Sequence, residues 1–281
     1  MFYLSDNDVH ELEQKANDIR ESTIEMLIAA GSGHTAGPLG MADIFALLYF
    51  RVLKHDAKNP DWEERDRFLL SIGHYAIALY AALIEAGVLA EEEIATYGVD
   101  DSRLPMSGMA SCTPGMEISG GSLGHGLGIA VGMGLGLKRK NSPSLVYNLM
   151  SDGELGEGST WEAAMAAAHH RLDNLIALVD FNDQQADGPS TATLSAEPVD
   201  AKWAAFGWHV QRVDGNDLDA LVDAFDEARA VTEPRPRVIV CDTRMCKGVP
   251  FLEARERTHF IRVEPDEWGQ ALDLLDAAMP S

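Results

Sequence analysis

Two oxygen-bearing side chains stand directly after two apolar runs, where they could together bind a metal ion. Asp152 follows the run 146–150, and Asn182 follows the run 175–181. The alanine-rich segment between them, 159–171, predicts a crossover helix that opens with a serine cap. Parallel strands joined by such a crossover lie about 4.8 Å apart, with their carboxyl ends side by side. We therefore expect Asp152 and Asn182 to meet at one edge of a sheet.

The oxygen chemistry of this pair suits magnesium. Mg²⁺ takes six oxygen ligands at about 2.0–2.1 Å, usually one or two of them carboxylates, with phosphates and water completing the shell. Asp152, Asn182 and a loop carbonyl near Gln184 would leave two positions for a diphosphate. The alternative is that both side chains are ordinary turn formers after strands, and the pair alone does not decide between these readings.

Three histidines stand in segments that favour function, although each alone is often a surface residue. His34 lies in the glycine-rich turn 31–40, His74 lies between a predicted strand and a helix, and His259 lies in the loop 247–262. Ligands of open α/β sheets bind beyond the carboxyl ends of the strands, which favours His74 in particular. Histidine titrates near neutral pH and therefore suits proton transfer.

The pattern of apolar segments predicts a single α/β domain over residues 1–281. Five buried strands are expected near residues 68, 146, 175, 208 and 238, each separated by helical sequence. Nearly continuous apolar strands of this kind are typical of one parallel sheet with helices on both faces. The predicted helices cover residues 5–30, 41–52, 75–86, 127–140, 159–171, 218–229 and 264–279.

A glycine-rich turn, 120–126, follows the long loop 98–121 and leads into the predicted helix 127–140. A loop of that length is more often functional than filler. Glycine in a helix costs roughly 1 kcal/mol per residue relative to alanine, so we expect close backbone packing as compensation. The turn fits neither the Walker pattern nor the dinucleotide fingerprint, although glycine-rich turns before helices do bind phosphate.

Composition excludes several classes of protein. The net charge is −23, from 22 basic and 45 acidic residues, which argues against nucleic acid or an anionic membrane as a partner. The three cysteines, Cys112, Cys241 and Cys246, form no CxxC pair and predict neither a disulfide framework nor a zinc ribbon. No secretory leader and no apolar run of about 18 residues is apparent, so we expect a soluble cytoplasmic protein.

Several segments of the sequence resemble the transketolase family, in the same order and over nearly the whole chain. Residues 151–153 through 182–188 resemble the motif of that family which binds thiamine diphosphate. The other matching segments read SGHTAGPLGMADIFALLY, RDRFLLSIGHYAIALYAAL, GMEISGGSLGHGLGIAVGMGLGLK, GELGEGSTWEAAMAAAHHRLDNL and AFGWHVQRVDGND. The resemblance implies the diphosphate-binding domain fold, with thiamine diphosphate and Mg²⁺, or Ca²⁺ or Mn²⁺ in its place, as cofactors.

The resemblance also implies roles for individual residues. Asp152 and Asn182 match the side-chain ligands of the metal, and the backbone oxygen of Gln184 matches a third ligand. Glu157 matches an acid at the subunit interface near the cofactor. The positions that match a cofactor lining are His74, Gly121, Ser122, Leu123 and Gly153. The positions that match histidines facing the reacting carbon, which bind donor oxygens and assist proton transfer, are His34, His74 and His259.

The chain ends where the first domain of the family ends. The pyrimidine-binding and C-terminal domains of a full-length transketolase are expected on a partner chain, so the resemblance implies one subunit of a split enzyme. A heterotetramer with a C-terminal transketolase-like subunit is expected, and the isolated chain is expected to be inactive. Such an enzyme would transfer a two-carbon ketol unit from a ketose donor to an aldehyde acceptor.

Three positions depart from the family pattern. Ser107 stands where a substrate-binding histidine is expected, His125 where glutamine is usual, and Ser151 where glycine is usual. The loss of a histidine at Ser107 leaves open acyl transfer from a 2-oxo acid to form an acyloin. A cofactor-binding subunit without activity is a further alternative. A metal hydrolase on the pair 169–170 is disfavoured, because adjacent helical residues do not share a face and HExxH is absent.

Overall fold

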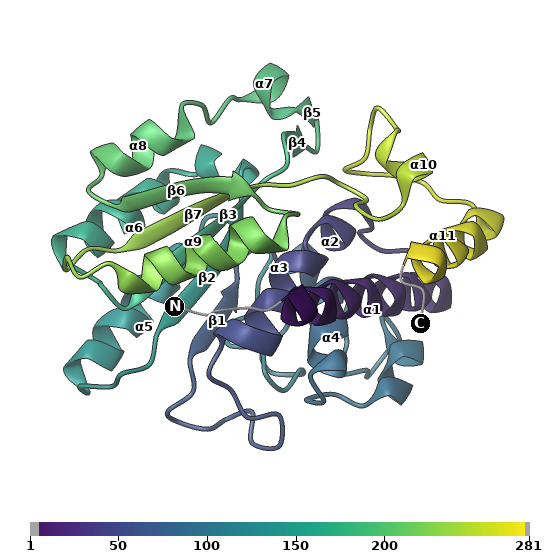
Figure 1. Cartoon of the computed structure of the whole chain (residues 1–281), viewed down its shortest axis with the longest axis horizontal. Helices are drawn as coiled ribbons and strands as arrows, with labels where there is room; N and C mark the ends of the chain where they lie inside the picture. The colour runs from purple at the N-terminus through teal and green to yellow at the C-terminus, as the bar shows by residue number, and fades with distance from the viewer. Residues whose placement is uncertain (1–5, 279–281) are drawn as a thin grey trace.

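A five-stranded parallel sheet forms the centre of the molecule (Figure 1). The computed structural model describes residues 6–278. The strands lie in the order β1-β2-β3-β7-β6. Their bounds are β1 Arg67–Leu70, β2 Val146–Ser151, β3 Leu175–Phe181, β7 Arg237–Asp242 and β6 His209–Asp214. All four pairings are parallel, which confirms the expected α/β class and the five expected strands.

Helices cover both faces of the sheet, as the apolar strands required. Side chains that alternate along β2 pack into different cores: Tyr147 and Leu149 into one, Val146 and Met150 into the other. The first core is covered by α1 Asp6–Ala30, α3 Ala42–Leu47, α4 Ala76–Glu85 and α9 Leu218–Ala230. The second core is covered by α5 Gly126–Arg139, α6 Gly158–His169 and α8 Val199–Ala205.

A third, smaller core joins the two ends of the described chain. Residues 245–252 and α11 Pro265–Ala278 pack on Ile24 of α1 and on α2 Ala36–Gly40. In Figure 1 the yellow segment that carries α10 Pro250–Glu253 and α11 lies beside α1. This packing fixes the loop 254–264, which carries His259, against the glycine-rich turn after α1.

Short elements complete the fold. A π-helical turn, Leu48–Val52, extends α3, which accounts for the longer helix expected over 41–52. Single 3₁₀ turns cover Gly73–Tyr75, Glu91–Thr96 and Gly153–Gly156. The remaining elements are the two-residue strands β4 Gln184–Gln185 and β5 Gly188–Pro189 and the helix α7 Ser190–Thr193.

Two local expectations need correction. Ser159 does not cap α6, because the cap position is Glu157 and the Ser159 hydroxyl donates to the carbonyl of Gly124 instead. Close packing explains only part of the glycine content of α5. A Cβ at Gly126 would lie 2.4 Å from Ser71, whereas Cβ atoms at three other α5 glycines would meet nothing within 4 Å. Those three outward-facing glycines are Gly128, Gly132 and Gly136.

The predicted ends of the outermost helices fall partly outside the described residues, since positions 5 and 279 lie beyond residues 6–278. Within those residues, no helix combines the length and the apolar character needed to cross a membrane.

Candidate cofactor and substrate site

The ends of β2 and β3 bring together the residues expected to hold a metal. Asp152 follows β2 and its amide donates to the carbonyl of Asp180 in β3, at 2.9 Å. Its carboxylate accepts hydrogen bonds from the Ser190 hydroxyl at 2.6 Å and from the Gly153 amide at 2.8 Å. The Asn182 side-chain oxygen accepts from the Gln184 amide at 3.0 Å. Asp152, Asn182 and Gln184 thus lie within one short network at the edge of the sheet.

The charge at this edge suits a cation. Asp152 is 2% exposed and Asp180 is 1% exposed, and neither carboxylate forms an ion pair with a described residue. Burial raises the pKa of Asp152 to about 6 and that of Asp180 to about 7. Buried carboxylates without a cation are costly, so a divalent ion coordinated by oxygen atoms fits this donor set.

Asp180 is a site residue that the sequence analysis did not single out. Its carboxylate accepts hydrogen bonds from Asn182 Nδ2 at 2.6 Å and from the Thr243 hydroxyl. Because Nδ2 faces Asp180, the amide oxygen of Asn182 is turned toward Gln184. The available signal was a carboxylate within an otherwise apolar strand, which is unusual unless the group has a task.

The glycine-rich turn before α5 lies against the end of β1. A Cβ at Gly73 would lie 2.2 Å from the backbone of Gly120 and Gly121, so only glycine permits this approach. Gly121 and Gly124 have φ angles of 114° and 80°, where side chains are strained. The expected cofactor positions Gly121 and Ser122 are exposed on this turn, and Leu123 is partly buried.

Glu154 holds the turn to the sheet. Its buried carboxylate accepts hydrogen bonds from the Ser71 hydroxyl, the Gly124 amide at 2.8 Å and the Ser151 amide at 3.2 Å. These three donors belong to the end of β1, the turn and the end of β2. Glu157, in contrast, is exposed, and its Cβ lies 2.6 Å from the position of a Cβ on Gly124. It therefore stands beside the turn with its carboxylate available to solvent or a partner.

The three histidines, although far apart in sequence, form one cluster. The ring centroids of His34 and His74 are 4.7 Å apart, and His259 lies 6.3 Å from His34 and 5.9 Å from His74. Desolvation lowers the pKa of all three, that of His74 to about 3. The rings are consequently neutral at pH 7, and each can donate one hydrogen bond and accept another.

The cluster faces a hollow of about 470 Å³. The other lining residues are Ser32, Gly33, Thr35, Tyr97, Met106, Ser107, Phe260 and Ile261. No carboxylate, lysine or arginine is among the described residues of this lining. The hollow therefore suits an uncharged, oxygen-rich part of a substrate.

The hollow and the metal edge are neighbours. Tyr75 follows His74 in the chain, and its hydroxyl accepts a 3.4 Å hydrogen bond from Asn182 Nδ2. Ser107, in the long loop, has its hydroxyl 3.1 Å from the position of a Cβ on Gly121. The loop thus brings the hollow next to the glycine-rich turn. His125 is exposed at the start of α5 and does not line the hollow.

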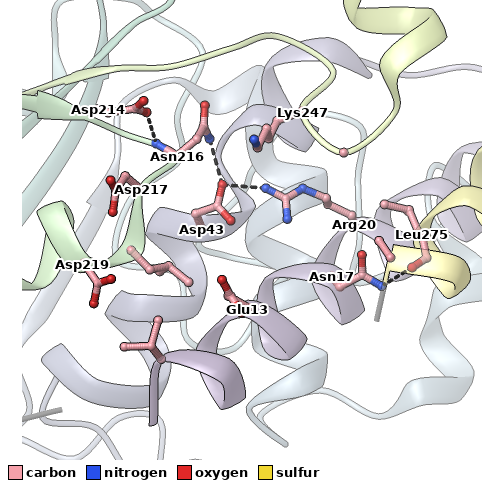
Figure 2. A pocket seen from close by; sticks show the side chains of 14 residues that line it. Glu13, Asn17, Arg20, Asp43, Asp214, Asn216, Asp217, Asp219, Lys247 and Leu275 are labelled. Atoms are coloured by element: carbon pink, nitrogen blue, oxygen red, sulfur yellow. Dashed lines mark hydrogen bonds and ion pairs between the residues drawn. The ribbon is translucent and has the colours of Figure 1, made fainter. Parts of the chain in front are cut away.

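A larger hollow, of about 570 Å³, lies elsewhere, between α1, α3, the start of α9 and α11 (Figure 2). Arg20 donates to Asp43 at 2.6 Å, and Asn216 donates to the same carboxylate at 2.8 Å. These bonds join α1 and α3 to the loop after β6, which accounts for the buried charges there. None of the expected site residues lines this hollow.

Clusters of histidine and acidic side chains can also bind transition metals, but the side chains of the described residues are not arranged as such a site. In the part of the chain that the structure describes, no group of three or more His, Cys, Asp or Glu side chains is arranged to hold a metal ion. The neighbouring rings of His169 and His170, 5.0 Å apart, are no exception. The three cysteines are free thiols.

A parallel α/β sheet with a glycine-rich turn beside the carboxyl ends of its strands is typical of proteins that bind a phosphorylated cofactor at that edge. Residues 12–272 match the family model described as "Transketolase, thiamine diphosphate binding domain". The chain belongs to the transketolase family and is a transketolase-like subunit of the transferase class, which confirms the resemblance read from the sequence.

Similar proteins include subunits of the same length. A putative uncharacterised transketolase family protein of Sinorhizobium fredii is 64% identical over 95% of this chain and 96% of its own. The 6-deoxy-6-sulfo-D-fructose transketolase subunit of a Clostridium species is 40% identical, over 95% and 96%. The transketolase structure from Pichia stipitis superposes with a TM-score of 0.85 at 29% identity. This chain covers 40% of that longer protein.

Proposed function

We propose that the chain is the cofactor-binding subunit of a split transketolase, which transfers a two-carbon ketol unit from a ketose donor to an aldehyde acceptor. The observation that carries this proposal is the cluster of three neutral histidines beside the oxygen-lined edge of the sheet. Removing a hydroxyl proton and returning it during carbon–carbon cleavage requires groups that exchange protons near neutral pH.

In this proposal, three residues would hold Mg²⁺, or Ca²⁺ or Mn²⁺ in its place, together with thiamine diphosphate. The ligands would be the carboxylate of Asp152, the side-chain oxygen of Asn182 and the backbone oxygen of Gln184. Gly153 and the turn 121–123 line the cofactor through their backbone. When bound, the cofactor supplies an electron sink for the carbon–carbon bond that breaks. Asp180 keeps the Asn182 oxygen turned toward the metal, acting as a positioning residue.

The histidines act on the substrate. In this proposal, His34, His74 and His259 bind the donor oxygens, and one of them takes up the proton of the hydroxyl next to the breaking bond. At pH 7 the rings are unprotonated, so each has a free nitrogen lone pair, and burial makes His74, with a pKa lowered to about 3, suited to hydrogen bonding and not to taking up the proton. Phe260 and Ile261 add apolar surface to the hollow, and in the complete enzyme a drier site would favour transfer of the two-carbon unit to the acceptor over its protonation and release.

A partner chain completes the enzyme in this proposal. The relative from Clostridium is named as a subunit and has a similar length, and the exposed glycines of α5 leave an unpaired helix face for an association. The partner is a C-terminal transketolase-like chain in a heterotetramer. Glu157, exposed beside the turn, is the acid that would face that interface near the cofactor.

Acyl transfer from a 2-oxo acid is the second candidate function, because Ser107 provides a hydroxyl where the family resemblance implies a histidine. A serine hydroxyl is smaller and does not exchange protons near neutral pH, so it suits a donor without a terminal hydroxymethyl group.

The two candidates are distinguished by donors offered to the complex reconstituted with the C-terminal subunit. Ketoses, including 6-deoxy-6-sulfo-D-fructose, and pyruvate are supplied with an aldehyde acceptor, thiamine diphosphate and Mg²⁺, and the products are identified by mass spectrometry. We expect products two carbons longer than the acceptor when a ketose is the donor, and no product when pyruvate is the donor. Turnover of pyruvate alone would favour acyl transfer, and no turnover with either class would overturn both candidates.

A further inference from the structure

A buried tyrosine hydroxyl without a partner lies in the wall of the histidine hollow. Tyr97 follows the 3₁₀ turn Glu91–Thr96 and is 1% exposed. Its hydroxyl oxygen has no hydrogen-bond partner among the described residues. A buried hydroxyl that is left unpaired costs about 1–3 kcal/mol, so an apolar phenylalanine would be the cheaper residue for packing alone.

This hydroxyl belongs to a residue that lines the substrate hollow. Both Tyr97 and Gly33 line the hollow with the three histidines. The Tyr97 hydroxyl lies only 3.3 Å from the position that a Cβ on Gly33 would occupy. Gly33 has a φ of 154° and carries no side chain, so no side-chain atom of this residue fills the space beside the Tyr97 hydroxyl.

A flexible residue lies next to Tyr97 in the wall of the hollow. Met106 packs on Gly98, the residue after Tyr97, with its Cγ 3.3 Å from the position of a Cβ there. The Met106 side chain is 41% exposed and lines the same hollow. Because an unbranched thioether changes rotamer easily, a ligand that enters the hollow can displace Met106 and reach the Tyr97 hydroxyl.

We propose that the Tyr97 hydroxyl donates a hydrogen bond to a hydroxyl or carbonyl oxygen of the substrate bound beside the three histidines, and is thereby a specificity-determining residue. This inference rests on the proposed ketol transfer and adds to it the recognition of one substrate oxygen. Burial raises the pKa of Tyr97 to about 12, so the group stays a neutral donor throughout the working range of such an enzyme. It selects substrates that carry an oxygen at this depth over analogues that lack one.

Tyr80 provides a matched control. Its ring lies 6.2 Å from that of Tyr97, and it is equally buried, but its hydroxyl donates to the carbonyl of Pro105 at 2.9 Å. The substitutions Tyr97→Phe and Tyr80→Phe therefore remove the same atom from similar surroundings, once from an unpaired and once from a paired hydroxyl.

The first test is thermal unfolding of the full chain without substrate. Tyr80→Phe is expected to lower Tm by about 2 °C or more, whereas Tyr97→Phe is expected to leave Tm unchanged or to raise it. If Tyr97→Phe lowers Tm as much as Tyr80→Phe does, its hydroxyl already has a partner in the resting protein, and the inference is overturned.

The second test uses the complex with the C-terminal subunit and a ketose donor that the wild-type complex turns over. Tyr97→Phe is expected to raise KM about tenfold for the donor or for the aldehyde acceptor, whichever oxygen it binds, with kcat changed less than twofold. Thiamine diphosphate affinity, measured by calorimetry, is expected to stay the same. If Tyr97→Phe has the same KM values as the wild-type complex for both the donor and the acceptor, the role of Tyr97 is overturned and the proposed function is not. A wild-type complex without any turnover would overturn the proposed function and this role with it.

Discussion

At the scale of single residues, burial decides the charge of the site. The histidines are held neutral because the hollow desolvates them, whereas Asp152 and Asp180 are buried carboxylates that lack a counterion in the described structure. Desolvation therefore holds the histidines as neutral hydrogen-bonding groups, whereas the buried carboxylates attract a cation. Each part gives a separate prediction.

Replacing Asp152 tests the metal part. Asp152→Ala removes the only charged protein ligand of the proposed cation, so thiamine diphosphate affinity in the presence of Mg²⁺ is expected to fall about 100-fold or more. Isothermal titration calorimetry measures this. Asp223→Ala, an exposed carboxylate on α9, is the control and should bind normally. Unchanged binding by Asp152→Ala would place the metal elsewhere.

Replacing His74 tests the desolvation of the cluster. The pKa of His74 is lowered from 6.5 to about 3, so below pH 6.5 the unfolded chain binds a proton that the folded chain does not. This linkage reduces folding stability as pH falls from 6.5 toward 3, by up to about 2 kcal/mol at pH 5. His74→Asn is expected to lose correspondingly less stability between pH 7 and pH 5, as measured by urea unfolding. The control is His10→Asn, at an exposed histidine. This variant should lose as much folding stability between pH 7 and pH 5 as the wild type does.

At the scale of elements, Glu154 connects three segments that the sequence separates. Glu154→Gln places an amide group among the donors of Ser71, Gly124 and Ser151, where at least one polar group must then stay unpaired. A loss of about 2–3 kcal/mol in the free energy of unfolding is expected. Glu162→Gln, an exposed change on α6 with the same loss of charge, should cost less than 0.5 kcal/mol. Equal stability of the two variants would show that Glu154 does not hold the turn.

Helix α5 gives the second prediction at this scale. A side chain at Gly132 meets nothing within 4 Å in the isolated chain, and leucine has the better helix propensity by roughly 0.8 kcal/mol. Gly132→Leu is therefore expected to stabilise the isolated chain slightly and to weaken its association with the C-terminal subunit at least about tenfold. Sedimentation velocity measures the association. Ala230→Leu, exposed on α9 at the opposite face of the sheet, should leave it unchanged.

At the scale of the whole molecule, the site lies where the carboxyl ends of β2 and β3 meet, next to the hollow that the three histidines line. The isolated chain is expected to show no ketol transfer, and addition of the C-terminal subunit is expected to restore activity to a saturating level at equal amounts of the two chains. The measurement is the rate of ketol transfer from a ketose donor to an aldehyde, with this chain at fixed concentration and the C-terminal subunit added in increasing amounts. Full activity of the isolated chain would contradict the split-enzyme proposal.

The sequence by itself determined the sheet, its parallel direction, the helices on both faces and the family. Apolar runs separated by amphipathic segments have few compact arrangements, so periodicity was sufficient for β1, β2, β3, β6 and β7, but not for the two-residue strands β4 and β5. The position of Asp152 and Asn182 at adjacent strand ends also followed, because parallel strands end at the same edge. Helix ends, such as the cap at Glu157 rather than Ser159, depend on hydrogen bonds across the fold and were not determined in this way.

Only the tertiary structure decided which distant groups meet and which remain unpaired. The three histidines come from different loops, and the separations of 5.9–6.3 Å between His259 and the other two depend on the packing of the C-terminal segment on α1 and α2. The roles of Asp180, Glu154 and Tyr97 arise from burial and from missing or shared hydrogen bonds. Those properties belong to the surroundings of a side chain, which long-range packing creates and local sequence does not encode.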